Sequence, residues 1–339
     1  MKVKICLIGK GTVGKCFLEL LNKKLPIFKH KFDIDIVIVG IFEIDGGLVN
    51  KSGLNIRKVI EMDKDFRKLN DWKFNINPLD LISKIDVDIC IETTPTNPET
   101  GEPALSHIKA AIKNGIHIIA SNKGPFYLKY KEIKELANKN ACLIQYEATV
   151  ASGVPILSIK KSLGASKIKA IRAILNGTSN YILSRMASEG IDFSIALKEA
   201  QELGYAEADP TLDIEGYDAA GKLVILANEL LGWSKSIQDV KIRGISKITP
   251  QAIELAKSDG YIIKHLAIAE NNSLIVEPRL IENYSALNIS GTLNVIELKT
   301  EYMGSIVLMG RGAGGYEAAS AILNDLFYIC DFLKKDDNI

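Results

Sequence analysis

The chain has 339 residues, of which 47% are hydrophobic, and its formal net charge is +1. A chain of this length and composition can bury a sizeable core in one or two domains. Because Lys and Arg are spread evenly, nothing favours binding to nucleic acid, and no apolar run is long enough to span a membrane.

The first predicted element is a buried strand at residues 3–8, which follows Met1 with no signal-peptide pattern. We therefore expect a cytoplasmic protein with reduced thiols. The five cysteines match neither a disulfide framework nor a metal site. Cys6, Cys90 and Cys142 fall inside apolar runs, so we expect them to be buried and inert.

Three glycines follow this strand in the pattern GxGxxG, and apolar residues at helical spacing come next. Gly9 allows a tight turn, Gly11 lets a pyrophosphate approach the backbone, and Gly14 lets the helix pack closely on the strand. The phosphates then meet the N-terminus of the helix. Since the motif has a strand before it and a helix after it, we predict a dinucleotide site.

The second strand, at residues 34–41, leads into Glu43, where a dinucleotide-binding fold places the acid that binds the adenosine ribose. Glu43 lies farther along the chain than the usual interval of about 20 residues, and we attribute the extra length to a basic loop around Lys29. Residues 51–77 are polar and predict a surface excursion with one helix near 56–62. Nothing in that excursion indicates chemistry.

Further strands are predicted at residues 87–91, 116–120 and 142–146, with helices between them. Five strands that alternate with helices predict a Rossmann-type α/β fold with a doubly wound parallel sheet. Thr93 and Lys123 follow two of these strands at their carboxyl ends, where open α/β sheets bind ligands. Lys123 could equally be a solvated loop lysine.

The alternation breaks down near residue 150, where a second domain begins. Its expected elements are a strand at 168–175, a turn at 176–180 that caps a helix, and four late strands. These strands, with few helices between them, predict an antiparallel sheet and an α+β domain. The four late strands are expected at residues 261–268, 274–280, 293–299 and 305–309.

The tail begins with a glycine-rich turn at 310–315 and continues as a helix with apolar residues at helical spacing. We expect this helix to return to the nucleotide domain. The predicted domains are therefore a dinucleotide-binding domain, a substrate-binding and dimerisation domain, and a returning glycine turn with its helix. Their ranges are 1–150, 151–309 and 310–339.

Residues 204–227 place four acidic residues in a loop marked by Gly and Pro, and a helix follows with Asp218 and Lys222 four residues apart. One interpretation is a surface acidic loop followed by an ordinary ion pair on a helix. The other is a site that uses these charges. Earlier in the chain, Glu147 and the carbonyl groups of the small-residue loop after it could hold a monovalent cation.

The motifs at 9–14, 121–125, 147–150, 176–180 and 204–223, in this order and at this spacing, together resemble homoserine dehydrogenases. The block at 204–223 is the most specific of them. Some relatives carry a fused kinase or a C-terminal regulatory domain, and because the chain ends at residue 339 we expect neither, nor feedback inhibition through such a domain.

The resemblance implies reversible reduction of L-aspartate 4-semialdehyde to L-homoserine by NAD or NADP, in threonine and methionine biosynthesis. It implies a homodimer or homotetramer formed through the second domain. Lys222 would be the acid/base, with Asp218 and Lys123 near it. The other implied residues are Gly9, Gly11, Thr12, Val13, Gly14, Glu43, Thr93, Lys123 and Gly314 for the cofactor, Gly177, Thr178, Tyr205, Glu207, Asp213 and Lys222 for the substrate, and Glu147, Val150, Ser152 and Val154 for a sodium ion.

Two alternatives stay open at this point. Another Rossmann-type dehydrogenase, such as an aspartate-semialdehyde dehydrogenase, needs a nucleophilic Cys with a His partner, and no Cys here stands in a polar loop near a His. A catalytically silent NAD(P) sensor would bind the cofactor without turnover. From Glu43 we predict that NAD is used at least as well as NADP, although Arg57 or Lys58 could fold back to hold a 2′-phosphate.

Overall fold

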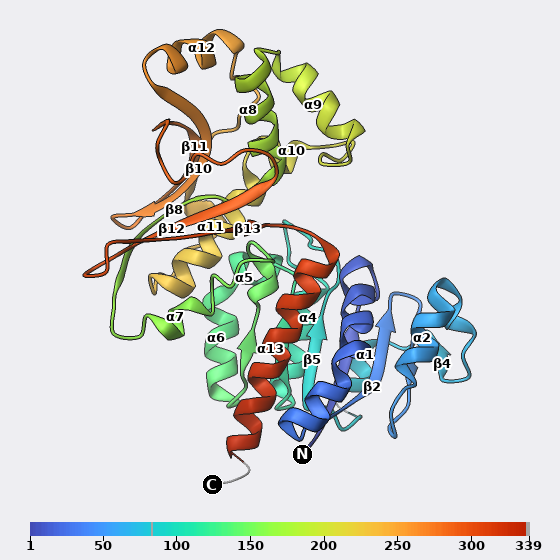
Figure 1. The fold of residues 1–339 in the computed structure, drawn as a ribbon. Helices are drawn as coiled ribbons and strands as arrows, with labels where there is room; N and C mark the ends of the chain where they lie inside the picture. The colour runs from blue at the N-terminus through green and yellow to red at the C-terminus, as the bar shows by residue number, and fades with distance from the viewer. Residues whose placement is uncertain (83, 337–339) are drawn as a thin grey trace. The chain divides into compact units, whose positions relative to one another are not determined.

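The computed structural model describes residues 1–82 and 84–336, which form two compact units. Unit 1 contains Met1–Thr149 together with the chain from Gly314 onward, and unit 2 is Val150–Ala313. The second boundary lies later than the expected residue 309, because the last strand of unit 2 stays paired with its neighbour as far as Arg311. Figure 1 traces both units along the chain.

Unit 1 is built around a sheet of seven described strands in the order β4-β3-β2-β1-β5-β6-β7. The five strands from β2 to β7 in this order are parallel, whereas β3 and β4 are antiparallel additions at one edge. The expected Rossmann-type parallel sheet is thus confirmed. The strands are β1 (Lys2–Ile8), β2 (Asp35–Glu43), β3 (Gly46–Val49), β4 (Trp72–Phe74), β5 (Ile89–Glu92), β6 (His117–Ala120) and β7 (Ile144–Gln145).

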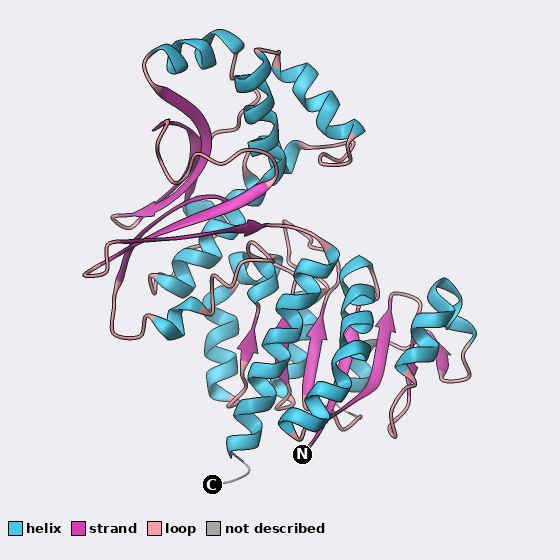
Figure 2. Ribbon diagram, viewed as in Figure 1, coloured by secondary structure: helices cyan, strands magenta, loops and turns pink. Residues whose placement is uncertain are grey.

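The strand order reverses at β1, which pairs with β2 on one side and β5 on the other. Helices cover both faces of this sheet (Figure 2). The carboxyl ends of strands at such a reversal are where doubly wound folds bind ligands. The helices of unit 1 are α1 (Thr12–Phe32), α2 (Ile56–Met62), η1 (Asp63–Lys68), α3 (Pro78–Ile82), α4 (Ala104–Lys113), α5 (Gly124–Leu128), α6 (Tyr130–Lys139), η2 (Glu147–Thr149) and α13 (Gly315–Asp336).

The basic stretch around Lys29 is the last turn of α1, so the loop expected there was wrong. Phe28 is buried, and Phe32 packs against Phe327 of α13, so the apolar face of the helix continues past its internal Pro26. Basic side chains in a last turn also interact favourably with the helix dipole. The late position of Glu43 therefore reflects a helix of 21 residues.

The C-terminal helix α13 returns to unit 1, as expected. It lies along α1 in Figure 1, and its apolar side chains join the core that fills one face of the sheet. Ala319, Ile322, Leu326 and Ile329 are fully buried there. Hydrophobic burial at helical spacing therefore attaches the end of the chain to the domain where it began.

Unit 2 contains a six-stranded sheet in the order β13-β12-β8-β10-β11-β9 among the described residues. Its pairs are antiparallel except β9 with β11, which is parallel. The expected α+β arrangement is confirmed. The strands are β8 (Ile168–Ile174), β9 (Val240–Ile242), β10 (Tyr261–Glu270), β11 (Ser273–Glu282), β12 (Leu293–Thr300) and β13 (Ser305–Arg311), and the helices are α7 (Ile159–Ser162), α8 (Gly177–Glu189), α9 (Phe193–Glu202), α10 (Thr211–Ile214), α11 (Tyr217–Leu230), η3 (Ile237–Asp239) and α12 (Pro250–Ser258).

Candidate functional site

The glycine turn after β1 has the geometry that a dinucleotide requires. Gly9 adopts φ +93°, which favours glycine, and its N–H donates to the carbonyl of Phe42 at 2.8 Å. A Cβ on Gly14 would lie 2.2 Å from the Gly9 carbonyl oxygen, so only glycine fits there without a shift of the backbone. Gly11 differs, since no heavy atom beyond its two chain neighbours lies within 4 Å of where its Cβ would stand. This open position leaves room for a pyrophosphate at the start of α1.

Glu43 lies at the end of β2, beside this turn, and its carboxylate accepts a hydrogen bond from the backbone N–H of Lys10. The acid expected to bind ribose is thus adjacent to the glycine turn even though the intervening helix is long. The residues around the turn fit an NAD(P) cofactor.

A group of cations close to Glu43 was missed from the sequence. Lys10 donates to the Asp63 carbonyl at 3.0 Å and lies over the Phe66 ring, while Lys15 pairs with Asp63 at 2.8 Å. Burial is the main cause that lowers the pKa of Lys10. The excursion that includes Asp63 and Phe66 therefore packs against the glycine turn, although its sequence indicated no chemistry. Lys10 could have been noticed, because it lies inside the GxGxxG motif.

The alternative cations named from the sequence lie in α2. Arg57 forms an ion pair with Glu61 at 2.9 Å and its side chain is 80% exposed, and the Lys58 side chain is also exposed. Closer to Glu43, Arg67 binds Asp45 through two hydrogen bonds of 2.7 and 3.1 Å.

Thr93 connects the carboxyl end of β5 to the glycine turn. Its hydroxyl lies 2.6 Å from the carbonyl oxygen of Gly9, and its own N–H donates to Ile8 at 2.9 Å. Lys123 is half-buried and lies just before α5, whose first turn closes on the Lys123 carbonyl. The neighbouring Asn122 ties the two loops together through Thr94 and Gly124.

Gly314 enters α13 with φ +138°, a conformation that favours glycine. A Cβ on the next residue, Gly315, would lie 2.9 Å from Sγ of Cys16 and 3.0 Å from a methyl group of Thr12. The glycine turn at the start of α13 thus lies against the first turn of α1. Unit 1 therefore brings together the predicted cofactor residues of the glycine motif, β2, β5 and the tail.

Unit 2 carries a buried cluster around Lys222. Its ammonium donates to Asp218 at 2.7 Å and to the carbonyl of Leu175 at 2.8 Å. The side chains of Lys222 and Asp218 are each only 11% exposed, so the pair is not the solvated surface contact of the simpler interpretation. Because charges are costly to bury without several partners, this arrangement suits a group that handles a proton.

Asn176 joins the acidic residues to this cluster, a role that the sequence did not reveal. Its amide donates to Asp213 at 2.6 Å and to Asp218 at 3.0 Å, and its oxygen caps α8 by accepting from Ser179. Burial, followed by the nearby Asp218, raises the pKa of the Asp213 carboxyl, against the hydrogen bond from Asn176. The signal in the sequence was the capping turn at 176–180, which we interpreted as structural.

The remaining predicted substrate residues surround this cluster less tightly. Thr178 donates to the carbonyl of Tyr205 at 2.8 Å, and the Tyr205 ring packs on Tyr181 with centroids 4.9 Å apart. Glu207 is exposed, and its carboxylate makes no hydrogen bond or ion pair with the described residues. It is therefore available to a ligand.

The segment 147–154 contains the predicted sodium ligands. Glu147 is buried, and its N–H donates to Asp325 at 3.0 Å. The Val154 carbonyl accepts a hydrogen bond from the N–H of Ile156 at 2.8 Å. No cluster of three His, Cys, Asp or Glu that could hold a metal ion occurs in the described part of the chain. A carboxylate and backbone carbonyls are hard oxygen ligands of the kind that monovalent cations prefer.

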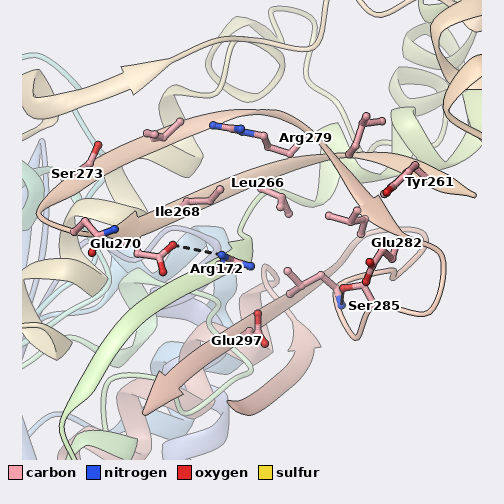
Figure 3. Close-up of a pocket in the computed structure, with 15 residues that line it drawn as sticks. Arg172, Tyr261, Leu266, Ile268, Glu270, Ser273, Arg279, Glu282, Ser285 and Glu297 are labelled. Carbon is pink, nitrogen blue, oxygen red and sulfur yellow. Dashed lines mark hydrogen bonds and ion pairs between the residues drawn. The ribbon is translucent and has the colours of Figure 1, made fainter. Parts of the chain in front are cut away.

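The six-stranded sheet of unit 2 also bears a pocket of about 740 Å³, whose lining includes none of the predicted site residues. Figure 3 shows Arg172 of β8 directed at Glu270 of β10, with which it forms an ion pair at 3.4 Å. Other walls come from β11, β12 and the segment after β11. Separately, the described helices include none that is long and apolar enough to cross a membrane.

Comparisons with known proteins agree on one family. The family model for homoserine dehydrogenase matches residues 155–327. A homoserine dehydrogenase of Methanocaldococcus jannaschii is 44% identical over 98% of this chain and 99% of that protein. An NAD(+)-dependent homoserine dehydrogenase of Pseudomonas canavaninivorans is 36% identical over 96% of each. The structure of a hyperthermophilic archaeal homoserine dehydrogenase in complex with NADPH has a TM-score of 0.83 at 27% identity, and covers 96% of this chain and 97% of that one.

Proposed function

The chain belongs to the homoserine dehydrogenase family, and we propose that Lys222 is the acid/base of its reaction, the NAD(P)-dependent interconversion of L-aspartate 4-semialdehyde and L-homoserine. The observation that carries this assignment is the buried contact of Lys222 with Asp218 and the Leu175 carbonyl. The bound nicotinamide supplies the hydride for reduction and accepts it for oxidation.

Lys222 would act where charge changes on the substrate oxygen. Reduction of the aldehyde creates an alkoxide, and the Lys222 ammonium can donate the proton that turns it into the hydroxyl of homoserine. In the oxidative direction the neutral amine takes this proton back. Asp218, at 2.7 Å, would keep the lysine oriented and would stabilise its charged form.

The substrate ends would be held by the other groups of unit 2. Asp213 and Glu207 are suited to the ammonium and hydroxyl ends, because Asp213 lies in the Asn176 network and Glu207 is free of other partners among the described residues. The amides of Gly177 and Thr178 belong to the first turn of α8, where N–H groups have no partner within the helix and can assist by hydrogen bonding. Tyr205 would line the same loop.

The cofactor would be held by unit 1. Gly9, Gly11, Thr12, Val13 and Gly14 would receive the pyrophosphate, Glu43 the adenosine ribose, and Thr93, Lys123 and Gly314 the nicotinamide half. Because the Glu43 carboxylate would repel a 2′-phosphate, we expect kcat/KM with NAD to equal or exceed that with NADP. A tenfold preference for NADP, about 1.4 kcal/mol in the other direction, would contradict this placement of Glu43. In that case Lys10 and Arg67 would be the cations expected to bind the 2′-phosphate of NADP.

We also infer a sodium ion at Glu147, Val150, Ser152 and Val154, supported by the chemistry of these groups, because a buried carboxylate and backbone carbonyls offer oxygen ligands. Replacing sodium chloride with choline chloride at equal ionic strength should lower activity, and Glu147→Gln should remove the difference between the two salts. Equal activity of the wild type in both salts would argue against the ion.

A homodimer or homotetramer formed through unit 2 is supported by β13, whose residues are exposed or only partly buried along both faces. Met309 and Val307 are 59% and 40% exposed there. Light scattering should give a mass of at least two chains, and Val307→Glu should reduce it.

The five free cysteines are consistent with a reducing, cytoplasmic location.

One assay separates this function from that of a silent cofactor sensor. The purified protein should reduce NAD or NADP at alkaline pH with L-homoserine as the sole substrate. A sensor would bind the cofactor, measured by fluorescence, and would show no turnover. Binding without turnover would therefore refute the proposal.

A further inference from the structure

Lys264 of β10 is a buried lysine that the proposed reaction does not use. It is 1% exposed, and its ammonium nitrogen contacts three oxygens: Asn180 Oδ1 at 3.1 Å, Ser184 Oγ at 3.3 Å and the carbonyl of Ile289. Asn180 and Ser184 belong to α8. None of these partners is a carboxylate, so among the described residues the charge is held by neutral groups alone.

All three partners need a proton from Lys264. The Asn180 amide nitrogen donates to the carbonyl of Gly291 at 2.8 Å, which orients the amide oxygen toward the lysine. The Ser184 hydroxyl donates its own proton to the carbonyl of Asn180 at 2.6 Å. A backbone carbonyl can only accept. An ammonium has three N–H groups and satisfies the set, whereas a neutral amine has two and leaves one acceptor without a donor.

The same network reaches the start of α8. Asn180 lies in the first turn of this helix, and its bond to Gly291 ties that turn to the segment before β12. The next residue of that segment, Thr292, packs on the helix start so closely that a Cβ on Gly177 would lie 2.6 Å from its carbonyl oxygen. The lysine therefore holds both α8 and the segment before β12, which meet at Gly177.

Charged groups on the elements around β10 do not compensate Lys264. Two of them, Glu254 and Lys257, are exposed on the surface of α12. The others form ion pairs with one another: Arg185 with Glu189 and Glu199 on α8 and α9, Arg279 with Glu277 on β11, Arg172 on β8 with Glu270, and Lys222 with Asp218 on α11. His265, the next residue, is buried, and its Nε2 forms a hydrogen bond with the backbone carbonyl of Arg243. Burial lowers the pKa of Lys264 to about 8. The lysine therefore loses its proton within the range in which a dehydrogenase is assayed.

We propose that Lys264 is a positioning residue whose ammonium group holds the substrate-binding turn at the start of α8, and that loss of its proton at alkaline pH loosens this turn and weakens substrate binding. This proposal rests on the assignment of Gly177 and Thr178 to the substrate. Lys264 itself touches neither substrate nor cofactor in this scheme, so kcat should change less than KM.

The test compares Lys264→Met with the wild type at several pH values between 6.5 and 9.5. Methionine keeps the buried chain and removes the proton. At pH 6.5 the variant should have a KM for L-homoserine about tenfold higher, the effect of a hydrogen bond to a charged group. The ratio of the two KM values should fall as the pH passes 8. This ratio cancels the pH effects that both proteins share, such as the titration of the substrate.

Lys257→Met, on the exposed side of α12, is the matched control and should give a KM ratio near one at every pH. Ser184→Ala is a second variant, for the case that Lys264→Met does not fold. It removes one acceptor, so a neutral amine then satisfies the remaining two, and the rise of KM at alkaline pH should be smaller than in the wild type.

A KM ratio for Lys264→Met that stays constant across the pH range would overturn the proposal, because a purely structural defect has no reason to titrate. An alkaline rise of KM in Ser184→Ala as large as that of the wild type would also overturn it. If the wild-type protein does not turn over L-homoserine at all, the proposed function fails instead, and the two failures are therefore distinct.

Discussion

The candidate site of unit 1 consists mainly of backbone groups, whereas that of unit 2 consists of side chains. In unit 1 the glycine turn would bind the cofactor through backbone groups. Its geometry depends on the absence of side chains, because a Cβ on Gly14 would lie 2.2 Å from the Gly9 carbonyl oxygen. In unit 2 the site depends on side chains that are present, because Asn176, Asp213, Asp218 and Lys222 form one hydrogen-bonded group.

This difference also separates a local motif from an assembled one. The glycine turn occupies six consecutive residues, and its meaning can be read without the rest of the chain. The Lys222 group joins three separate segments, from the end of β8, the loop at α10 and the start of α11. Unit 1 should therefore be damaged by adding atoms, and unit 2 by removing functional groups.

The largest expected effect is in unit 2. Lys222→Ala removes the proposed proton donor, so kcat should fall by about a hundredfold to ten-thousandfold while the affinity for NAD stays unchanged. Steady-state kinetics and cofactor titration of the folded variant, checked by circular dichroism, measure both. If Lys222 formed only a buried ion pair, the variant would lose about 3–5 kcal/mol of stability, because Asp218 would stay buried without its partner, and the folded protein would keep its turnover.

A second effect concerns the acid stability of unit 2. His265 is 3% exposed and packs against Gly216 at the start of α11, and burial lowers its pKa from 6.5 to about 4. Since the folded state holds the neutral ring, its stability is complete above pH 6.5 and is lost as the pH falls through 4. The loss should be about 3 kcal/mol.

Urea unfolding at pH 7 and pH 4 measures this loss, and His265→Gln should show a correspondingly smaller one. The exposed His30→Gln is the control and should behave as the wild type. An unchanged acid dependence in His265→Gln would assign the loss to other groups.

In unit 1 two glycines of the same turn should respond differently to an added methyl group, one in stability and the other in cofactor binding. Gly14→Ala places a Cβ against backbone and should destabilise the protein by about 1–3 kcal/mol. Gly11→Ala meets no protein atom within 4 Å, so the melting temperature should hold while the KM for the cofactor rises. Thermal melts and cofactor kinetics of both variants test this pair, and equal melting temperatures would contradict the geometry of the turn.

The smallest effect is expected at the exposed edge of unit 2. Glu207→Gln keeps the shape of the side chain and removes its charge, so the KM for the amino acid should rise by up to about tenfold with little change in kcat. Steady-state kinetics with L-homoserine measure both constants. A fall in kcat with an unchanged KM would instead give Glu207 a part in the chemical step.

Much of the fold could be predicted because its signals are periodic and local. The parallel strands of unit 1, the antiparallel ones of unit 2 and the return of α13 follow from apolar runs and helical spacing. The stretch around Lys29 was misjudged because its charges suggested a loop, whereas the buried Phe28 and the packing of Phe32 on Phe327 decide for helix. Phe32 and Phe327 are separated by almost three hundred residues in the chain.

The candidate site residues also differ in whether their contacts are local or distant in the chain. By itself the sequence determined the glycine turn, the pairing of Asp218 with Lys222 and the capping role of Asn176, because each depends on residues within a few positions of one another. Only the tertiary structure decided that Asn176 also binds Asp213, that Asp63 and Phe66 lie beside Lys10, and that Lys264 holds α8 with no carboxylate partner. These contacts join segments that are distant in the chain, and whether a charge there is solvated or buried depends on packing that no local pattern encodes.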